Sequence, residues 1–526
     1  MNIPLIAKPI IDQYTGDQKL EMWFNGHVSY VKAPFKHYFY SIYQFKNQIC
    51  EEQVNKILFS TLQSTNLYRY SFQNTKLLNQ YKEEDSIEAG LYYTDKVLID
   101  EPDFFMKFPN SEPVKVLFFD IETDTTGMFP TPDRNAIIAI GCKCGNDKAI
   151  FMSETYNNDK IILNKFFDFI QKTDPDIITH YNGNAFDIPY CIERMKINNI
   201  PLNRWSRNKH DPHIYKETVT FGGRLSFDLY HEVQKDQTLF GIKNLKMKTV
   251  AKFLNMDKKL DIKEIQYSEM RSIVNTPILK KYLISDIEIT ELLFYIYFKN
   301  IEMLAEMNKI PLNLMMDASA SFLPNIIHGR AFKDLNMVSD KMNKDRHPNY
   351  IKNKQGALTD TYNPGLYLNK VYKVDFSSEY PNIIRTFNLS PETTTIKMYN
   401  VFTGKYNFDI TNPQKCILDI PDSVANKNII IEINMEKKGF LTKFISDILI
   451  ERFAIKKRMK EIKKDSSEYE YLHVRQNALK LVANIVSGYH GQEYSLYGDL
   501  GVYCAITGLG RFYLQLAMDR IKELSE

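Results

Sequence analysis

The feature that most constrains this fold is the apolar run "VKVLFFDIETD" at residues 114–124. A continuous run of this kind predicts a buried strand, and a second run, "AIIAIGCKC", follows at residues 136–144. Helix-like "KIILNKFFDFIQK", strand-like "DIITHYN" and helix-like "DIPYCIERMKINN" come next, and the periodic helix "LKKYLISDIEITELLFYIYF" closes the pattern at residues 279–298. Strands that alternate with helices predict an α/β unit.

The length and composition limit what the rest of the chain can be. At 526 residues the chain is longer than one hydrophobic core usually serves, so we expect about three domains. A hydrophobic content of 44% and a charged content of 25% are typical of globular proteins. The net charge of +3 is nearly balanced, so any contact with nucleic acid must come from local groups of Lys and Arg.

The cysteines and the N-terminus indicate the compartment. Six scattered cysteines are too few for a disulfide framework in a chain of this length, which favours a reducing environment. The N-terminal "MNIPLIAKPI" lacks the basic and then apolar order of a signal peptide, and no apolar run approaches the roughly 18 residues of a spanning helix. We therefore expect a soluble, cytoplasmic protein with no membrane partner.

Two carboxylates stand at the end of the first predicted strand. Asp120 and Glu122 are two residues apart, so both side chains lie on one face of the sheet, where a divalent cation relieves their repulsion. Asp187 lies at the start of a predicted helix, and Asp286 lies one helical turn after Tyr282 on the same helix face. Each acid alone is more often a solvated charge or a helix cap. Together, in this order, they favour two-metal phosphodiester hydrolysis with Tyr282 orienting the water.

A fifth candidate carboxylate, Asp375, lies in "KVDFSSEYPNII". The preceding "YKV" predicts a strand, which Pro381 ends before a helix begins. Ser378 and nearby backbone N–H groups would meet a triphosphate at this turn, and the Tyr380 ring would reject a ribose 2′-hydroxyl by its size. Taken alone, the stretch is more simply a structural turn with an aromatic plug.

Two helices joined by a short polar segment predict a hairpin between about residues 440 and 490. Arg452 and Lys456 lie four residues apart on the first helix, and Lys480 and Asn484 lie four residues apart on the second. Such a hairpin would aim three cations at one phosphate chain, as the binding of a nucleoside triphosphate requires. The alternative is a basic face that is solvated or lies near the phosphate backbone of DNA.

These motifs together resemble the family B DNA polymerases, and most closely the phage replicative type. "FFDIETD", "YNGNAFD" and "YLISD" are similar to the three exonuclease motifs of that family, with Asn182 and Phe186 also matching. "DFSSEYPNIIRTFNLSPET" is similar to the first polymerase motif, and "KLVANIVSG" is similar to the fingers-helix motif, with Gly488 in place. The similarity runs from about residue 100 to the end of the sequence.

The resemblance implies an α/β and α+β multidomain fold, with an N-terminal β-rich lobe, a ribonuclease-H-like 3′–5′ exonuclease domain, an incomplete palm and helical-hairpin fingers, and without a thumb. The implied domains are the N-terminal domain (1–108), the exonuclease domain (109–300), a helical return to the N-terminal domain with a linker (301–346), the first part of the palm (347–438), the fingers (439–491) and a truncated second part of the palm (492–526).

The resemblance also implies roles for the candidate residues. The Mg²⁺ ions of proofreading, or Mn²⁺ as a substitute, would be held by Asp120, Glu122, Asp187 and Asp286, with Tyr282 also catalytic. Asp375 would bind Mg²⁺ in the palm. The incoming dNTP, paired with a primer–template DNA, would be bound by Ser378, Tyr380, Arg452, Lys456, Lys480 and Asn484.

The sequence departs from the family pattern at several positions. Glu379 stands where the family generally has leucine, and Ser487 stands where the fingers motif has tyrosine. Tyr489 is nearby but not at the matching position. The fingers are also short, because only 28 positions separate Arg452 from Lys480.

The largest departure concerns the second palm motif, a hairpin of the Tyr-Gly-Asp-Thr-Asp type that brings the partner carboxylate of Asp375. "YGDLGVY" at residues 497–503 follows the fingers too closely to be that hairpin, and the sequence stops at Glu526. We therefore expect the N-terminal part of a split polymerase, whose second polypeptide supplies the missing palm motif and thumb and contacts any sliding clamp. The alternatives are a stand-alone 3′–5′ exonuclease and an inactive truncated polymerase that only binds DNA. A viral protein of this kind would act in the host cytoplasm or nucleoid.

Overall fold

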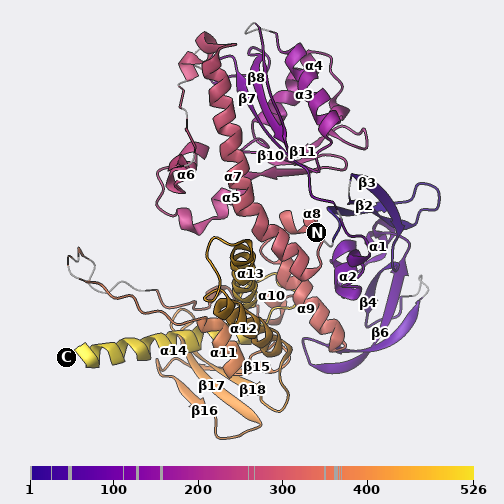
Figure 1. The fold of residues 1–526 in the computed structure, drawn as a ribbon. Helices are drawn as coiled ribbons and strands as arrows, with labels where there is room; N and C mark the ends of the chain where they lie inside the picture. Colours follow the sequence, from indigo (N-terminus) through magenta and orange to yellow (C-terminus); the bar gives the residue numbers. More distant parts are fainter. Residues whose placement is uncertain are drawn as a thin grey trace. The chain divides into compact units, whose positions relative to one another are not determined.

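The computed structural model describes residues 3–525 except residues 25, 46–49, 111, 126–128, 155–157, 259, 263, 266, 349–350, 360–364, 367 and 369. The chain forms two compact units (Figure 1). Unit 1 contains Met1–Ile10, Lys19–Lys32 and Asp103–Asp317, and unit 2 contains Ile11–Gln18, Ala33–Pro102 and Ala318–Glu526. Residues of the predicted N-terminal domain, 1–108, therefore occur in both units.

Unit 1 is built around a five-stranded sheet in the order β13-β10-β7-β8-β9. Its strands are β7 (Val116–Thr123), β8 (Ile137–Cys144), β9 (Asp147–Met152), β10 (Ile177–His180) and β13 (Leu225–Asp228). β10 pairs in parallel with β7 and β13, whereas β8 pairs antiparallel with β7 and β9. The two apolar runs that predicted buried strands are β7 and β8, and the predicted α/β unit is confirmed.

Helices cover both faces of this sheet (Figure 1). They are α3 (Lys160–Thr173), α4 (Asp187–Ile197), α5 (Leu229–Lys235), α6 (Met247–Phe253), α7 (Pro277–Asn308) and α8 (Leu312–Met316). Successive residues of β7 point to opposite faces: Phe119 contacts Phe166 of α3, and Phe118 contacts Phe294 of α7. Asp120 and Glu122 share the α7 face with Phe118 because they continue the same alternation.

Short elements complete unit 1. A three-stranded sheet consists of β1 (Ile6–Ile11), β2 (Gln18–Phe24) and β3 (His27–Lys32), and a hairpin consists of β11 (His213–Tyr215) and β12 (Thr218–Thr220). Short 3₁₀ helices occur at Phe105–Lys107, Leu202–Trp205, Gln237–Leu239, Met256–Lys258 and Tyr267–Ile273.

Unit 2 contains two four-stranded sheets. The first, in the order β14-β5-β6-β4, consists of β4 (His37–Ser41), β5 (Glu52–Leu58), β6 (Gln63–Phe72) and β14 (Met337–Val338). Its helices are α1 (Thr75–Tyr81), α2 (Tyr93–Asp100), α9 (Phe322–Asp334) and α10 (Asn343–Arg346), followed by a short turn of helix at Ile351–Asn353. The second, in the order β15-β18-β17-β16, consists of β15 (Thr394–Val401), β16 (Asn407–Asp409), β17 (Lys415–Asp422) and β18 (Lys427–Asn434).

Four helices accompany the second sheet: α11 (Glu379–Thr386), α12 (Phe440–Arg458), α13 (Ser467–Tyr489) and α14 (Leu500–Ser525). Gly508 lets α14 pack closely on β17, because a Cβ there would lie 2.4 Å from Cγ2 of Ile420. The predicted helical hairpin is confirmed as α12 and α13, which an ion pair between Arg475 and Glu451 joins at 2.6 Å. Within the described part of the chain, no helix is long and apolar enough to cross a membrane.

The prediction of a strand just before and at Asp375 is wrong. Residues 371–376 have no regular secondary structure, and α11 begins at Glu379 with Pro381 inside its first turn. The apolar pattern that predicted the strand is present, but no strand among the described residues pairs with it. The side chains of Val371, Tyr372 and Val374 are consequently 74%, 84% and 76% exposed.

Candidate active sites

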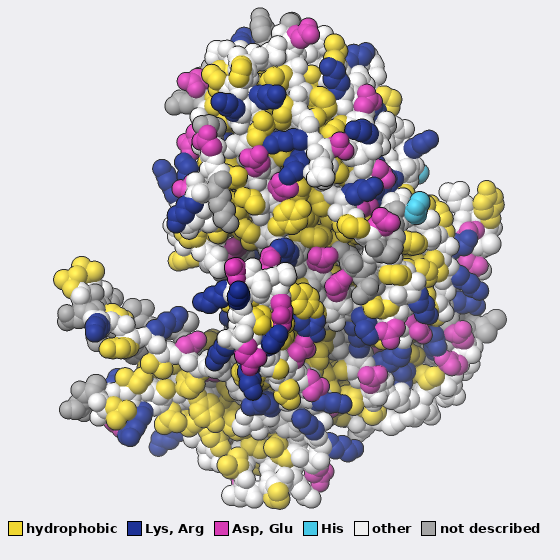
Figure 2. All heavy atoms as spheres, in the orientation of Figure 1, with side chains coloured by type: hydrophobic (Ala, Val, Ile, Leu, Met, Phe, Trp, Pro, Cys, Tyr) yellow, Lys and Arg dark blue, Asp and Glu magenta, His cyan; other side chains and the backbone are white. Residues whose placement is uncertain are grey.

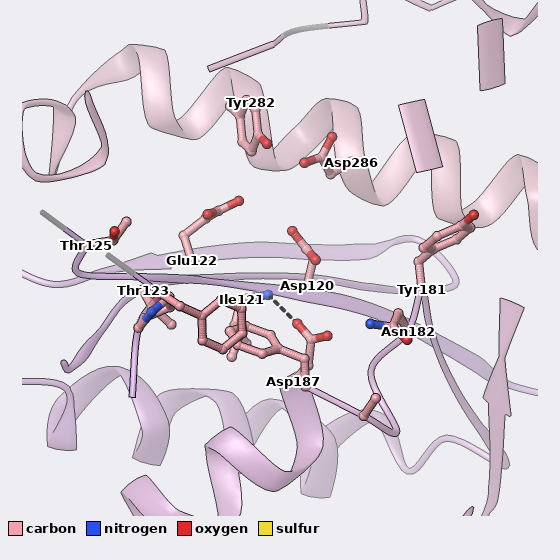
Figure 3. Close-up of a pocket in the computed structure, with 14 residues that line it drawn as sticks. Asp120, Ile121, Glu122, Thr123, Thr125, Tyr181, Asn182, Asp187, Tyr282 and Asp286 are labelled. Carbon is pink, nitrogen blue, oxygen red and sulfur yellow. Dashed lines mark hydrogen bonds between the residues drawn. The ribbon is translucent and has the colours of Figure 1, made fainter. Parts of the chain in front are cut away.

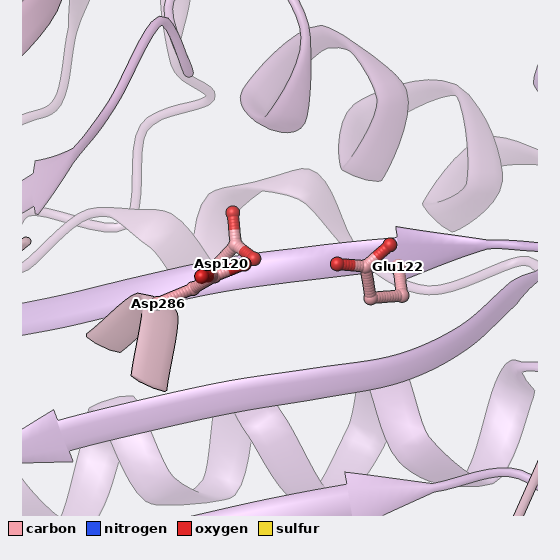
Figure 4. Close-up of side chains that lie close together, drawn as sticks. All are labelled: Asp120, Glu122 and Asp286. Atoms are coloured by element: carbon pink, nitrogen blue, oxygen red, sulfur yellow. The ribbon is translucent and has the colours of Figure 1, made fainter. Parts of the chain in front are cut away.

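The first predicted carboxylate set lines one cavity of about 700 Å³ in unit 1 (Figure 3). Asp120 and Glu122 project from β7 towards α7, and Asp286 projects back from α7 (Figure 4). One ligand oxygen from each of these three acids lies within 4.8 Å of the others. Asp187 enters the same cavity from the first residue of α4 and accepts a hydrogen bond of 3.4 Å from the Ile121 backbone N–H.

The local sequence explains why these side chains converge. The alternation of β7 puts two acids on one face, and the spacing of four residues on α7 puts Tyr282 and Asp286 on one side of the helix. Both α7 side chains line the cavity. The structure thus brings together five of the predicted site residues at one cavity: Asp120, Glu122, Asp187, Tyr282 and Asp286.

Burial and mutual repulsion perturb these carboxyl groups. Burial, followed by the charges of neighbouring acids, raises the pKa of Asp120 and of Glu122 well above its ordinary value. Burial also raises the pKa of Asp187 to about 7 and that of Asp286 to about 6. Such crowding is stable only when protons or cations neutralise it. Carboxylate oxygens are the ligands that Mg²⁺ and Mn²⁺ prefer, so the grouped oxygens of Asp120, Glu122 and Asp286 fit a divalent metal ion.

Lys248 is a charged residue of the site that the sequence did not reveal. Its Nζ lies 3.0 Å from Oδ1 of Asp286 and 3.4 Å from the centroid of the Tyr282 ring. Its charge lowers the pKa of Asp286 against the effect of burial. Lys248 lies on the short helix α6, in a lysine-rich segment where no spacing distinguishes it from its neighbours.

Aromatic side chains form part of the cavity wall. Phe129 and Phe186 line it, with ring centroids 5.8 Å apart and the rings edge to face. Phe129 is largely exposed, so its face is available to a ligand. An exposed ring of this kind can stack on a nucleic-acid base.

The second predicted set is only partly brought together, in unit 2. Ser378 adopts a left-handed backbone conformation just before α11, and its Oγ lies 3.2 Å from Nη1 of Arg452, which is 9% exposed. Tyr380 is half-buried beside Gly510, where an added Cβ would lie 3.0 Å from the ring. Asp375 is exposed in the segment without a strand. Lys456, Lys480 and Asn484 are exposed on the α12–α13 hairpin.

The positions that depart from the family pattern have defined surroundings. Glu379 begins α11, and its pKa is raised by burial and by the charge of Asp375. Ser487 is buried and donates a hydrogen bond of 2.7 Å to the Ala483 carbonyl. Tyr489 is fully buried and bonds Asn325, so it does not face the hairpin surface.

Asp499, the acid of the stretch "YGDLGVY", has a structural role. It is half-buried, and its Oδ1 accepts a hydrogen bond of 2.9 Å from the Val502 N–H in the first turn of α14. A carboxylate that caps a helix in this way is already satisfied.

Two family models match the chain. Residues 70–250 match the model described as the exonuclease domain of DNA polymerase family B, and residues 310–525 match the model described as DNA polymerase family B. The chain belongs to the family B DNA polymerases. The exonuclease range of this family B chain includes Asp120, Glu122, Asp187 and Lys248 but ends before α7, and the polymerase range includes the whole second set.

Relatives support this assignment. The chain is 26% identical over 425 residues to DNA polymerase 2 of Aeropyrum pernix, a match that covers 78% of this chain and 49% of that protein. It is 26% identical over 466 residues to the DNA polymerase of Pyrococcus glycovorans, covering 84% of this chain and 55% of the relative. The chain therefore spans about half the length of the curated relatives it matches.

A solved structure supports the fold. The family B DNA polymerase from the archaeon Pyrobaculum calidifontis superposes with a TM-score of 0.77 at 22% sequence identity. The match covers 99% of this chain and 72% of that protein. The predicted mixed α/β multidomain architecture of this family B chain is thereby confirmed.

Proposed function

We propose that this family B chain removes nucleotides from the 3′ end of DNA. The observation that carries the proposal is the convergence of Asp120, Glu122 and Asp286 within 4.8 Å, together with Asp187, on one open cavity. These four acids would hold two Mg²⁺ ions, which supply an activated water and neutralise the phosphate when bound.

The chain's own side chains would complete the site. The Tyr282 hydroxyl would orient the attacking water by a hydrogen bond, since it shares the cavity with Asp286. The exposed face of Phe129 would stack on a terminal base. Lys248, 3.0 Å from Asp286, would hold that carboxylate ionised and in place before the metal arrives.

We further propose that the chain supplies half of a DNA-synthesising centre. Asp375 would bind Mg²⁺, and Tyr380 would exclude ribonucleotides through its position at the start of α11. The triphosphate of the dNTP would be bound by Ser378, Arg452, Lys456, Lys480 and Asn484. Support comes from the contact between Arg452 and Ser378, which brings the fingers hairpin to the Asp375 turn. Assignment to the phage replicative type stays a prediction, as does a cytoplasmic location.

The other half of the centre would come from a second polypeptide that carries the partner carboxylate and the thumb. The unpaired segment 371–376 supports this, because its apolar side chains are exposed where a strand would bury them. Figure 2 shows hydrophobic side chains crowded over the region of β16, β17 and α14. Exposed apolar residues of unit 2 include Leu516 and Ile521 of α14, Met398 and Val401 of β15, and Leu366 and Leu368 just before the segment 371–376. A sliding clamp would be contacted through this second subunit.

A labelled primer–template assay tests both parts of the proposal. The purified chain with Mg²⁺ and four dNTPs is expected to shorten the primer without extending it. Asp120→Ala should abolish shortening, whereas Asp147→Ala, an exposed acid at the start of β9, should leave it unchanged. Full activity of Asp120→Ala would refute the assignment of the pocket. Extension by the chain alone would refute the need for a second polypeptide. A result with neither shortening nor extension would favour a truncated chain that only binds DNA.

A further inference from the structure

A buried polar cluster lies behind the carboxylate cavity, where β10 and β13 end. The parallel register of these strands puts His180 next to Asp228. His180 is fully buried, and Asp228 and Asn184 are each 6% exposed. Ser226, two residues before Asp228, contacts both His180 and Asn184. None of these four residues lines the carboxylate cavity, but the neighbouring Asn182 does.

The hydrogen-bond directions exclude a Ser-His-Asp nucleophilic triad. The Gly183 N–H donates to Nδ1 of His180 at 3.1 Å, so the neutral ring carries its proton on Nε2. Nε2 then donates to Ser226 Oγ at 3.0 Å, and Ser226 donates onward to Asn184 Oδ1 at 2.9 Å. A general base for Ser226 would need a bare Nε2. Hydrogen-bond donation therefore proceeds from His180 to Ser226 and from Ser226 to Asn184, in the loop before α4.

The cluster instead binds the backbone of the loop that leads to Asp187. Oδ1 of Asp228 accepts the Asn182 N–H at 2.7 Å, and Oδ2 accepts the Asn184 N–H at 3.0 Å. With the bond from Gly183 to His180, three successive backbone donors of the loop are held by two side chains. Oδ1 of Asp228 also caps α5 through the Tyr230 N–H at 3.0 Å.

The loop needs this support because its own geometry is unfavourable. Asn182 has a φ of 63°, in the left-handed region, which costs a non-glycine residue energy. Gly183 lies so close to the His180 ring that an added Cβ would be 2.5 Å from Cγ. The loop can therefore rest on His180 only with glycine at this position, and α4 and Asp187 follow directly after it.

We propose that Asp228 and His180 are positioning residues of the 3′-end-cleaving site, which fix the loop at residues 182–184 so that Asp187 reaches its metal. The inference rests on the proposed exonuclease function. Substitution of a residue that orients a metal-binding side chain through hydrogen bonds typically changes metal affinity or activity by about 10- to 100-fold.

Asp228→Asn tests the proposal with little change in volume. In either orientation, the new amide group would point an N–H at the backbone N–H of Asn182 or Asn184, so the loop would lose a partner. We expect the Mg²⁺ concentration that gives half-maximal 3′ cleavage to rise by about 10- to 100-fold. Ser226→Ala is a second, less disruptive variant, because it removes only the hydrogen bonds that connect His180 to Asn184. It should raise the half-maximal Mg²⁺ concentration by a smaller factor.

Asp176→Asn is the matched control. Asp176 is 5% exposed, accepts a backbone N–H from Lys115 at 2.9 Å and precedes β10 at the end of the strand away from the cavity. It should lower the thermal unfolding midpoint about as much as Asp228→Asn while leaving the Mg²⁺ dependence unchanged. Equal Mg²⁺ dependence in the two variants would overturn the positioning role. If Asp120→Ala is inactive but Asp228→Asn and Ser226→Ala bind Mg²⁺ normally, only this inference fails.

Discussion

Adding Mg²⁺ to the metal-free protein at pH 7 is expected to expel about two protons from the carboxylate pocket, because bound metal needs deprotonated oxygens. The ligand oxygens of Asp120, Glu122 and Asp286 lie within 4.8 Å of one another. Two unit charges at that separation repel by about 3 kcal/mol at an effective dielectric of about 20, equivalent to roughly 2.5 pKa units. Burial, reinforced by this repulsion, raises the pKa of Asp120 and of Glu122 well above normal, and burial raises the pKa of Asp187 to about 7.

The sign of the effect on stability follows from the same pKa shifts. Between about pH 4 and pH 7 the folded, metal-free pocket holds protons that the unfolded chain releases. The free energy of unfolding without metal should therefore fall as pH rises through this window. Mg²⁺ should reverse the trend, since it replaces the protons and binds only the folded pocket.

Calorimetric Mg²⁺ titrations at pH 7 in two buffers of different ionisation enthalpy measure the protons released. Asp120→Ala should release fewer protons and bind Mg²⁺ weakly, and Asp147→Ala should behave as the unmodified protein. Mg²⁺ binding without proton release would refute the inference that burial and mutual repulsion keep these acids protonated.

Four further predictions concern single positions. Lys248→Met should move the acid limb of 3′ cleavage to higher pH in a pH–rate profile, because it removes the charge that lowers the pKa of Asp286. Tyr380→Ala, in the chain reconstituted with the proposed second polypeptide, should admit ribonucleotides, and unchanged discrimination would contradict the sugar contact. Gly439→Ala should destabilise unit 2 by about 1–3 kcal/mol in chemical denaturation, because its Cβ would lie 2.4 Å from Cβ of Ser390. Burial lowers the pKa of His328 to about 4, so acidification from pH 7 to pH 5 should lower the free energy of unfolding by about 2 kcal/mol through this residue. The His328→Gln variant should not show this part of the loss.

The carboxylate pocket could be predicted because its geometry depends on local periodicities. Asp120 and Glu122 share a face through strand alternation, and Tyr282 and Asp286 share one through helix spacing. Lys248 could not be predicted in the same way. Its contact with Asp286 depends on how α6 packs against α7, which no spacing within "LKMKTVAKF" encodes.

The cluster behind the pocket shows the same limit. His180 and Asp228 are 48 positions apart, and only the parallel register of β10 with β13 makes them neighbours. From the sequence, His180 is one residue in an apolar strand, and Asp228 is an ordinary helix cap. Both side chains can bind the backbone of residues 182–184 because β10 and β13 are neighbours in the sheet. The order of strands and helices along the chain does not determine which strands are neighbours.

The two proposed activities differ in whether their acids lie on elements that are already folded, because Asp375 lies in a segment that forms no strand. A strand is stabilised by pairing with neighbouring strands, whereas the apolar pattern of residues 371–376 gives only a preference for the strand conformation. Fixing the backbone of such a segment costs about 1–2 kcal/mol per residue, on the order of 10 kcal/mol in all. A Mg²⁺ ion bound to Asp375 alone cannot offset that cost, but pairing on both edges with burial of Val371 and Val374 can. The exonuclease pocket has no such requirement, because β7, α4 and α7 already belong to the core of unit 1. Cleavage at the 3′ end should therefore proceed with this chain alone. Synthesis should begin only when a β-strand of the proposed second polypeptide has paired with residues 371–376 and ordered Asp375.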